Sequence, residues 1–262
     1  MNMEHVAEAI NILGAFCGPR DVDELSRTAL QASFGVSRAD VAVLFGGSIL
    51  AGGDVMAQTM QRELAEKYIL VGGRGHTTDA LRQNMERALQ KKMASDASEA
   101  EMFQLYLKTR YGLAANHLEC QSTNCGNNIT FLLDLLQREK IPHRSILMIQ
   151  DASMQRRMTA TWCRQAGDSA LVVNYAAYRV HVTVVDGSLR FTETPPGMWD
   201  MKRYIRLLLG DTARLRDDEN GYGPRGKGFL AHVDTPREVE SAFRYLKQFF
   251  PVRAALEHDA PI

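Results

Sequence analysis

Glycines and polar residues directly follow several short apolar runs, and these are the residues whose types and spacing could bind a ligand. They are Gly46, Gly47 and Ser48, then Gly72, Gly73 and His76, then Glu119, Ser122, Asn124 and Asn128, and finally Asp151 and Arg157. A pair of glycines lets the backbone turn sharply and approach a ligand, because no Cβ stands in the way. The polar side chains can bind hydroxyls, amines or a carboxylate. Because the carboxyl ends of parallel strands lie at one edge of a sheet, we predict that these residues form one site.

Each of these residues also has a simpler structural explanation. A tight strand–helix turn needs glycine whether or not a ligand binds, and His76 could be an ordinary residue at a helix start. Glu119 could bind ribose hydroxyls or be solvated, and the asparagines could cap a helix. Arg157 could be solvated on a helix face, or it could contact an anion. We predict no metal site, because the four cysteines show no metal-ligand spacing.

The elements that must position these residues alternate between strand and helix. Strands are expected at 40–45, 68–71, 116–120, 145–150 and 170–174, with a helix over about 54–67 and a capping box at Ser98 and Glu101. This alternation predicts an α/β fold, a Rossmann-like three-layer sandwich with a mainly parallel sheet. A hairpin over 178–192, turning at Asp186-Gly187, is expected to extend one edge of that sheet.

The remaining segments divide the chain into three predicted parts. Residues 1–39 form a helical segment that packs on the core and covers an edge of the sheet, with Asp21 and Glu24 capping its second helix. Residues 40–195 form the Rossmann-like domain. Residues 196–262 form a smaller C-terminal appendage with a helix over 199–209, a glycine-rich loop over 210–228 and a terminal helix. That loop is either a mobile lid, with Arg225 and Lys227 suited to cover an anion, or a poorly ordered region.

Composition excludes several classes of function. The 262-residue chain has equal numbers of basic and acidic residues, which disfavours nucleic acid as a partner. No apolar run approaches the roughly 20 residues that span a bilayer, so we expect no membrane association. The N-terminus lacks a basic signal region, and unpaired cysteines are typical of a reducing compartment, so we expect a cytoplasmic protein. A small molecule is the expected partner, and a homodimer stays open.

Four stretches together resemble the bacterial YdcF/SanA/ElyC family over residues 40–174. They are VLFGGS, ILVGGRG, ECQSTNCGNN and ILMIQDASMQRR. The two glycine pairs match the family pattern, as do Glu119, Ser122, Asn124, Asn128 and Arg157. The chain departs from that pattern at three positions: Cys125 stands where the family has Thr, Asn127 where it has Glu, and Met154 where it often has His. Two groups that could transfer a proton are therefore absent.

The resemblance implies a Rossmann-like fold and the binding of S-adenosyl-L-methionine. Three functions stay open on this basis. The chain could bind S-adenosyl-L-methionine and transfer its methyl group to an unassigned acceptor. It could instead be a hydrolase or transferase that acts on a phosphorylated or nucleotide-sugar substrate, with the glycine turns and Arg157 binding the anion. Lastly, it could be a non-catalytic regulatory protein that is stabilised by its ligand.

Overall fold

A five-stranded parallel sheet forms the centre of the protein. The computed structural model describes residues 2–47, 49–75 and 77–251. The strands are β1 (Ala39–Phe45), β2 (Ala65–Val71), β3 (His117–Glu119), β4 (Ser145–Ile149) and β5 (Leu171–Asn174), in the order β3-β2-β1-β4-β5. The chain builds outward from β1 to β3, then crosses back to place β4 on the other side of β1. This reversal of direction creates a topological switch point between β1 and β4.

Helices cover both faces of the sheet and give the predicted three layers. They are α3 (Ala51–Gln61), α4 (Thr78–Leu89) and α5 (Glu99–Tyr111), followed by α6 (Cys125–Arg138) and α7 (Gln155–Ala166). Alternate residues of β1 face opposite sides, so Leu44 packs in one core with α3 and α5, and Val43 packs in the other with α6 and α7. The Rossmann-like α/β architecture is therefore confirmed.

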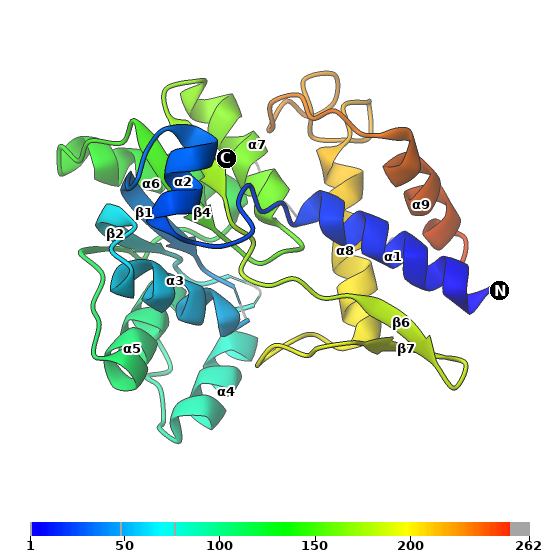
Figure 1. The fold of residues 1–262 in the computed structure, drawn as a ribbon, viewed down its shortest axis with the longest axis horizontal. Coiled ribbons are helices and arrows are strands. Elements are labelled where there is room, and N and C mark those ends of the chain that lie inside the picture. Colours follow the sequence, from blue (N-terminus) through cyan, green and yellow to red (C-terminus); the bar gives the residue numbers. More distant parts are fainter. Residues whose placement is uncertain (1, 48, 76, 252–262) are drawn as a thin grey trace.

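The two ends of the chain pack together beside this sandwich. The elements are α1 (Met3–Cys17), α8 (Met201–Leu215), α9 (Arg237–Lys247) and the hairpin of β6 (Val182–Val185) and β7 (Ser188–Phe191). Figure 1 shows α1 lying against α8 and α9 although they come from opposite ends of the sequence. The first helix of the N-terminal segment therefore packs on the C-terminal helices and the hairpin. The part of this segment that meets an edge of the sheet is residues 20–21, which bond to Asn174 and Tyr175 at the end of β5.

The hairpin forms with the predicted tight turn but in a different place. Asp186 and Gly187 have φ values of 49° and 69°, which the twist of a two-residue hairpin requires. The two strands form a sheet of their own and do not extend the central one. The reason is packing: Val182 is buried in the core that includes α1, and the Phe191 ring contacts Tyr204 of α8 at 5.4 Å between centroids.

Several element boundaries differ from the sequence prediction. The predicted helix over 54–67 ends at Gln61, because Glu63 takes a left-handed φ of 50° and β2 begins at Ala65. Helix α2 (Arg27–Phe34) is capped by Ser26, while Asp21 accepts hydrogen bonds from Asn174 instead. Helix α8 continues through Gly210 to Leu215, well beyond the predicted end at 209, since its buried face continues. The capping box of Ser98 and Glu101 is confirmed.

Candidate functional site

A cavity of about 210 Å³ opens at the carboxyl edge of the sheet, beside the switch point. The structure brings most of the predicted site residues to its wall, from the loops that follow β1, β2, β3 and β4. These are Gly46, Gly47, Gly72, Gly73, Ser122, Asn124, Asn128, Asp151 and Arg157. Ser48 and His76 lie outside the described residues. The residues meet because parallel strands end at the same edge of a sheet.

The four glycines have different roles in this wall. Three of their N–H groups bond to protein carbonyls: Gly46 to Val71, Gly72 to Glu119 and Gly73 to Ser122. A Cβ at Gly73 would overlap the Ser122 carbonyl, so this glycine is required by loop packing. These three N–H groups are therefore not available to a ligand. The remaining glycine, Gly47, has no acceptor for its N–H within the described part of the chain.

Asp151, two residues beyond the end of β4, is the most heavily hydrogen-bonded acid of the cavity. Only 7 % of the residue is exposed. Its Oδ1 accepts from the N–H and hydroxyl of Ser153, both at 2.8 Å, and from the Tyr178 hydroxyl at 2.7 Å. Its Oδ2 has a single long contact, 3.4 Å to Nε1 of Trp199. Burial raises the pKa of Asp151 while these donors act to lower it. Oδ2 can therefore still accept a hydrogen bond from a ligand.

Asn128 is buried at the cavity wall with an amide that the protein does not use. It lies in the first turn of α6 and is 9 % exposed. In the described ranges no group hydrogen-bonds to its side chain. An amide at a cavity wall that has no protein partner is available to bond to a water or a ligand.

The other polar residues of the β3–α6 loop hold the loop itself together. The Ser122 hydroxyl accepts from the Gly73 N–H at 3.2 Å, and Asn124 caps α6 by accepting from the Asn127 N–H at 3.0 Å. Glu119 does not line the cavity, contrary to the expectation that it reaches a ribose. Its Oε1 accepts from the backbone N–H groups of Gln121 and Ser122, so this carboxylate stabilises the conformation of the loop.

Glu99 is an acid of this cavity that sequence reasoning missed. It is the first residue of α5, is 7 % exposed, and lies against both Gly46 and Gly72. Its Oε1 accepts from the hydroxyls of Thr77 at 3.1 Å and Thr78 at 2.8 Å. Burial raises its pKa, and the two hydroxyls act to lower it. In the sequence, Glu99 is one of two acids after the cap residue Ser98, and nothing there marks it as the buried one.

Helix α8 contributes further residues to the wall of the cavity. Asp211 forms a buried ion pair with Arg157, whose side chain is 13 % exposed against 3 % for Asp211. Arg214 and Leu207 of the same helix also line the cavity, together with Trp199 just before it. The sequence prediction ended this helix before Asp211, and so missed its contribution. A buried-face pattern running past Gly210 was the signal that could have revealed it.

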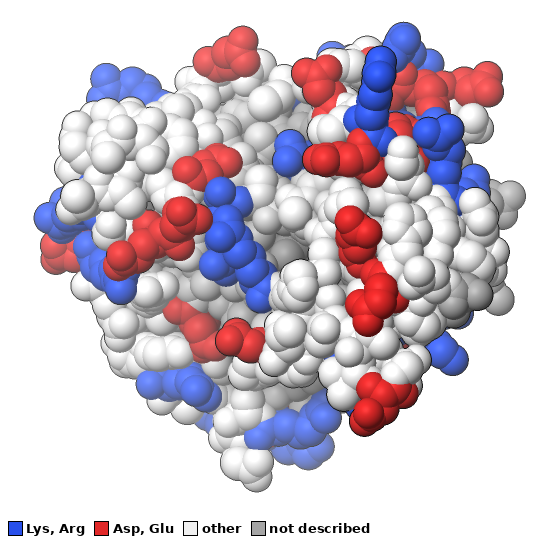
Figure 2. Space-filling view, turned by 45° about the vertical axis from the view of Figure 1, so that its right-hand side comes forward, with Lys and Arg blue, Asp and Glu red and all other residues white. Residues whose placement is uncertain are grey.

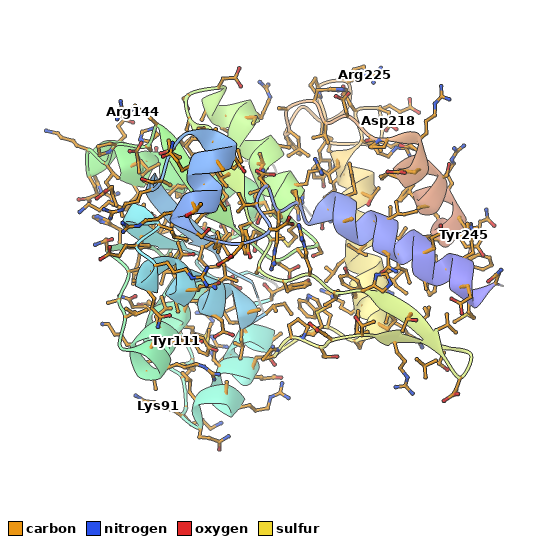
Figure 3. The ribbon with its side chains drawn as sticks, viewed as in Figure 1. Lys91, Tyr111, Arg144, Asp218, Arg225 and Tyr245 are labelled. Carbon is orange, nitrogen blue, oxygen red and sulfur yellow. The ribbon has the colours of Figure 1, made fainter. Side chains whose placement is uncertain are left out.

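The glycine-rich segment between α8 and α9 does not reach the cavity. Residues 221–226 have the spacing G-x-G-x-x-G, but they follow no strand and open no helix, as the dinucleotide fingerprint requires. Arg225 pairs with Asp217 at 3.4 Å, and Lys227 lies 5.0 Å from the ring centre of Tyr222. Figure 3 shows Arg225 at the outer edge of the molecule. Neither cation lines the cavity, so the lid interpretation gains no support from them.

Three further properties of the chain bear on its function. Within the described residues, no three His, Cys, Asp or Glu side chains are grouped so that they could hold a metal ion. No helix in that same part of the chain is both long enough and apolar enough to cross a membrane. No protein-family model matches the sequence.

Proposed function

We propose that this protein binds a small molecule in the switch-point cavity, and that the ligand is S-adenosyl-L-methionine. The observation that carries the proposal is the set of polar groups at the cavity that the protein leaves unused. The Asn128 amide and the Gly47 N–H have no partner in the described ranges, and Asp151 Oδ2 has only a long one. Convergent polar groups of this kind in a cleft at the switch point are typical of a ligand site.

The charges at the cavity suit this ligand, which has an amino-acid end, a sulfonium centre and a nucleoside. Arg157 and Arg214 line the cavity and would bind the ligand's carboxylate, and Asp151 would bind its ammonium or sulfonium group. The Trp199 ring and the Met154 side chain provide apolar surface for a base, and the Asn128 amide can bond to its edge. The identity of the ligand rests on the resemblance to the YdcF/SanA/ElyC family, which implies S-adenosyl-L-methionine.

Bound in this way, the ligand would supply an electrophilic methyl group. The residues of this chain would bind and orient it, and α8 would shield it from water. Met154 lies on the cavity wall where related sequences often have histidine, so this position offers no proton-transfer group. Methionine at this position is consistent with a protein that binds its ligand without catalysing a reaction.

A hydrolase or transferase that acts on a phosphorylated substrate is the second candidate. The observation in its favour is the presence of two arginines, Arg157 and Arg214, beside the buried acid Asp151 in one cavity. Guanidinium groups bind phosphate in a bidentate manner, and a carboxyl whose pKa is raised by burial can act as a general acid. Calorimetry separates the candidates: saturable heat with S-adenosyl-L-methionine supports the first. No heat and no thermal shift at millimolar ligand, with turnover of a phosphorylated substrate, would establish the second.

Valine at Gly47 is expected to weaken ligand binding by about tenfold or more, equivalent to about 1.4 kcal/mol. A Cβ there would have ordinary contacts, 3.5 Å to Oε1 of Gln150 and 3.9 Å to Cβ of Asp151. The protein should therefore fold, while the branched side chain occupies the approach to Asp151. Isothermal titration calorimetry measures the change. The control is Glu119→Gln, which removes the charge of a residue that does not line the cavity and keeps Oε1 as an acceptor for the loop. This variant should bind the ligand with the affinity of the wild type. Equal affinity of Gly47→Val and wild type would show that this loop is only a turn.

Replacing Asn128 with leucine is expected to weaken ligand binding and to change the melting temperature little. The change removes an amide that has no hydrogen-bond partner among the described residues and substitutes an apolar group of similar size, so no hydrogen bond within the protein is lost. The same change removes a hydrogen-bonding group from the cavity. Thermal unfolding and calorimetry on one preparation measure both effects. A variant that is less stable than wild type would mean that the amide has a structural partner, and the ligand argument from Asn128 would fail.

A further inference from the structure

A second cavity, of about 570 Å³, is lined by Ala152 and Tyr178, both of which are neighbours of Asp151. Its wall consists of the end of α1, residues 18–20 and the segment 178–181 that leads into β6. Tyr178 lines this second cavity and donates its hydroxyl to Asp151, which lines the first. The two cavities are thus separate spaces with a shared wall. The binding chemistry of the second is independent of which ligand the first one holds.

Arg20 is the main polar feature of this second cavity. Its Nε donates to the Ala176 carbonyl at 2.7 Å, and its guanidinium carbon lies 4.2 Å from the ring centre of Tyr175. Among the described residues, no carboxylate forms an ion pair with it and no group accepts from its Nη atoms. Burial lowers the pKa of Arg20, as expected for a cation removed from water without a counter-charge.

The backbone holds this arginine in a fixed orientation. Arg20 pairs with Tyr175 in an isolated antiparallel bridge, and the Ala176 N–H donates to the Pro19 carbonyl at 3.1 Å. Residues 175–177 in turn continue the ladder of the central sheet, since the Ala177 N–H donates to Gln150 at 2.8 Å. The guanidinium is therefore ordered before any ligand arrives, which reduces the entropy lost on binding.

Further donors line the same space. Arg179 lines this cavity and is exposed, and its ion-pair partner in the described part of the chain is the solvated Asp23, at 3.4 Å. Nε2 of His181 lies 3.3 Å from the Asn11 amide nitrogen. Because that nitrogen can only donate, Nε2 is the acceptor and Nδ1 carries the proton. The tyrosine hydroxyls of the wall include that of Tyr204.

The positive character is local to this cavity. Glu193 is the one carboxylate among the described residues of its wall. The adjoining trough along α1 is lined by three carboxylates and one arginine, namely Glu4, Glu8, Glu238 and Arg156. Figure 2 shows acidic and basic side chains interspersed over the surface, in keeping with a net charge of zero. The group of cations is therefore not a consequence of a generally basic protein, and an anion is favoured in this cavity over the neighbouring trough.

We propose that this cavity is a second binding site, which takes a small molecule carrying a carboxylate or a phosphate, and that the guanidinium of Arg20 is its main contact. Arginine presents a planar fork of donors that matches both anions in a bidentate manner. Arg179 and the Nδ1–H of His181 would supply further contacts from the opposite wall.

Titration with inorganic phosphate or with succinate tests this proposal. Sodium chloride keeps the ionic strength constant, and nuclear magnetic resonance follows the Nε–H of Arg20 and the backbone amides of 176–181. The expected result is a saturable shift with one of the two anions, which identifies its class. Arg20→Gln should weaken that binding roughly tenfold, since it removes a charge-assisted bidentate contact. Arg179→Ala should weaken it by a smaller factor.

The control is Arg190→Ala, which removes the same charge from an exposed position on the same hairpin, outside the cavity. Its affinity should equal that of wild type. The proposal would be overturned if the chemical shifts grew linearly without saturation, or if Arg179→Ala and Arg190→Ala lost the same amount of affinity. Either result would show general electrostatic screening in place of binding at a site. If Arg20→Gln does not fold, the exposed Arg179→Ala still decides the matter, and Arg20→Lys tests the fork geometry at constant charge.

Discussion

Alanine at Asp211 is expected to lower the free energy of unfolding by about 3–5 kcal/mol, the usual cost of removing one partner from a buried ion pair. Asp211 is 2 % exposed, and its carboxylate contacts Nε of Arg157, which is itself largely buried. Without the carboxylate, the guanidinium stays in the wall between α7 and α8 and loses its ion pair with Asp211. Urea denaturation followed by far-ultraviolet circular dichroism measures the loss.

Two further variants separate the charge from the packing. Asp211→Asn keeps the shape and removes only the charge, so it should also destabilise the protein. The double change Arg157→Met with Asp211→Leu replaces the pair by apolar groups, which is often neutral or favourable for stability, and it should recover most of the loss. The same double variant should lose ligand binding, because Arg157 lines the cavity. A loss below about 1 kcal/mol in Asp211→Ala would indicate a solvated pair and contradict this interpretation.

Alanine at Gly46 is expected to destabilise the protein by about 1–3 kcal/mol, whereas alanine at Gly47 should have little effect. A Cβ at Gly46 would overlap the carboxylate of Glu99 and lie 3.0 Å from its Cβ. Glu99 cannot move aside easily, because it begins α5 and is held by two threonine hydroxyls. The neighbouring position has its nearest atom at 3.5 Å. Thermal unfolding of the two alanine variants provides a matched comparison within one loop.

A double-mutant cycle with Glu99→Ser assigns the cause. Serine shortens the side chain that the new methyl group meets, so Gly46→Ala should cost much less in this background. The coupling should be absent for Gly47→Ala with Glu99→Ser. If Gly46→Ala costs the same in both backgrounds, the overlap with Glu99 is not the reason for glycine at this position.

Part of the candidate site could be predicted from the sequence, because strand ends are encoded locally. Val41–Phe45 is an apolar β-branched run that stops at Gly46, and such runs form buried parallel strands. Once the sheet is parallel, its topology places Gly47, Asn128 and Asp151 at one edge without further information. The roles of Ser122 and Asn124 were less predictable, because their residue types suit a loop contact and a ligand contact equally well.

The sequence by itself determined the order of helices and strands, the hairpin turn at Asp186-Gly187 and the cap at Ser98, since each depends on residues within one or two turns of chain. Only the tertiary structure decided that Asp211 faces Arg157, that Glu119 turns beneath its loop, and that α1 packs on α8 and α9. These contacts join segments far apart in the chain, or depend on how a helix is rotated against its neighbours. Residue type and local spacing do not carry that information, because the same acid is stable on a solvated face or beside a buried guanidinium.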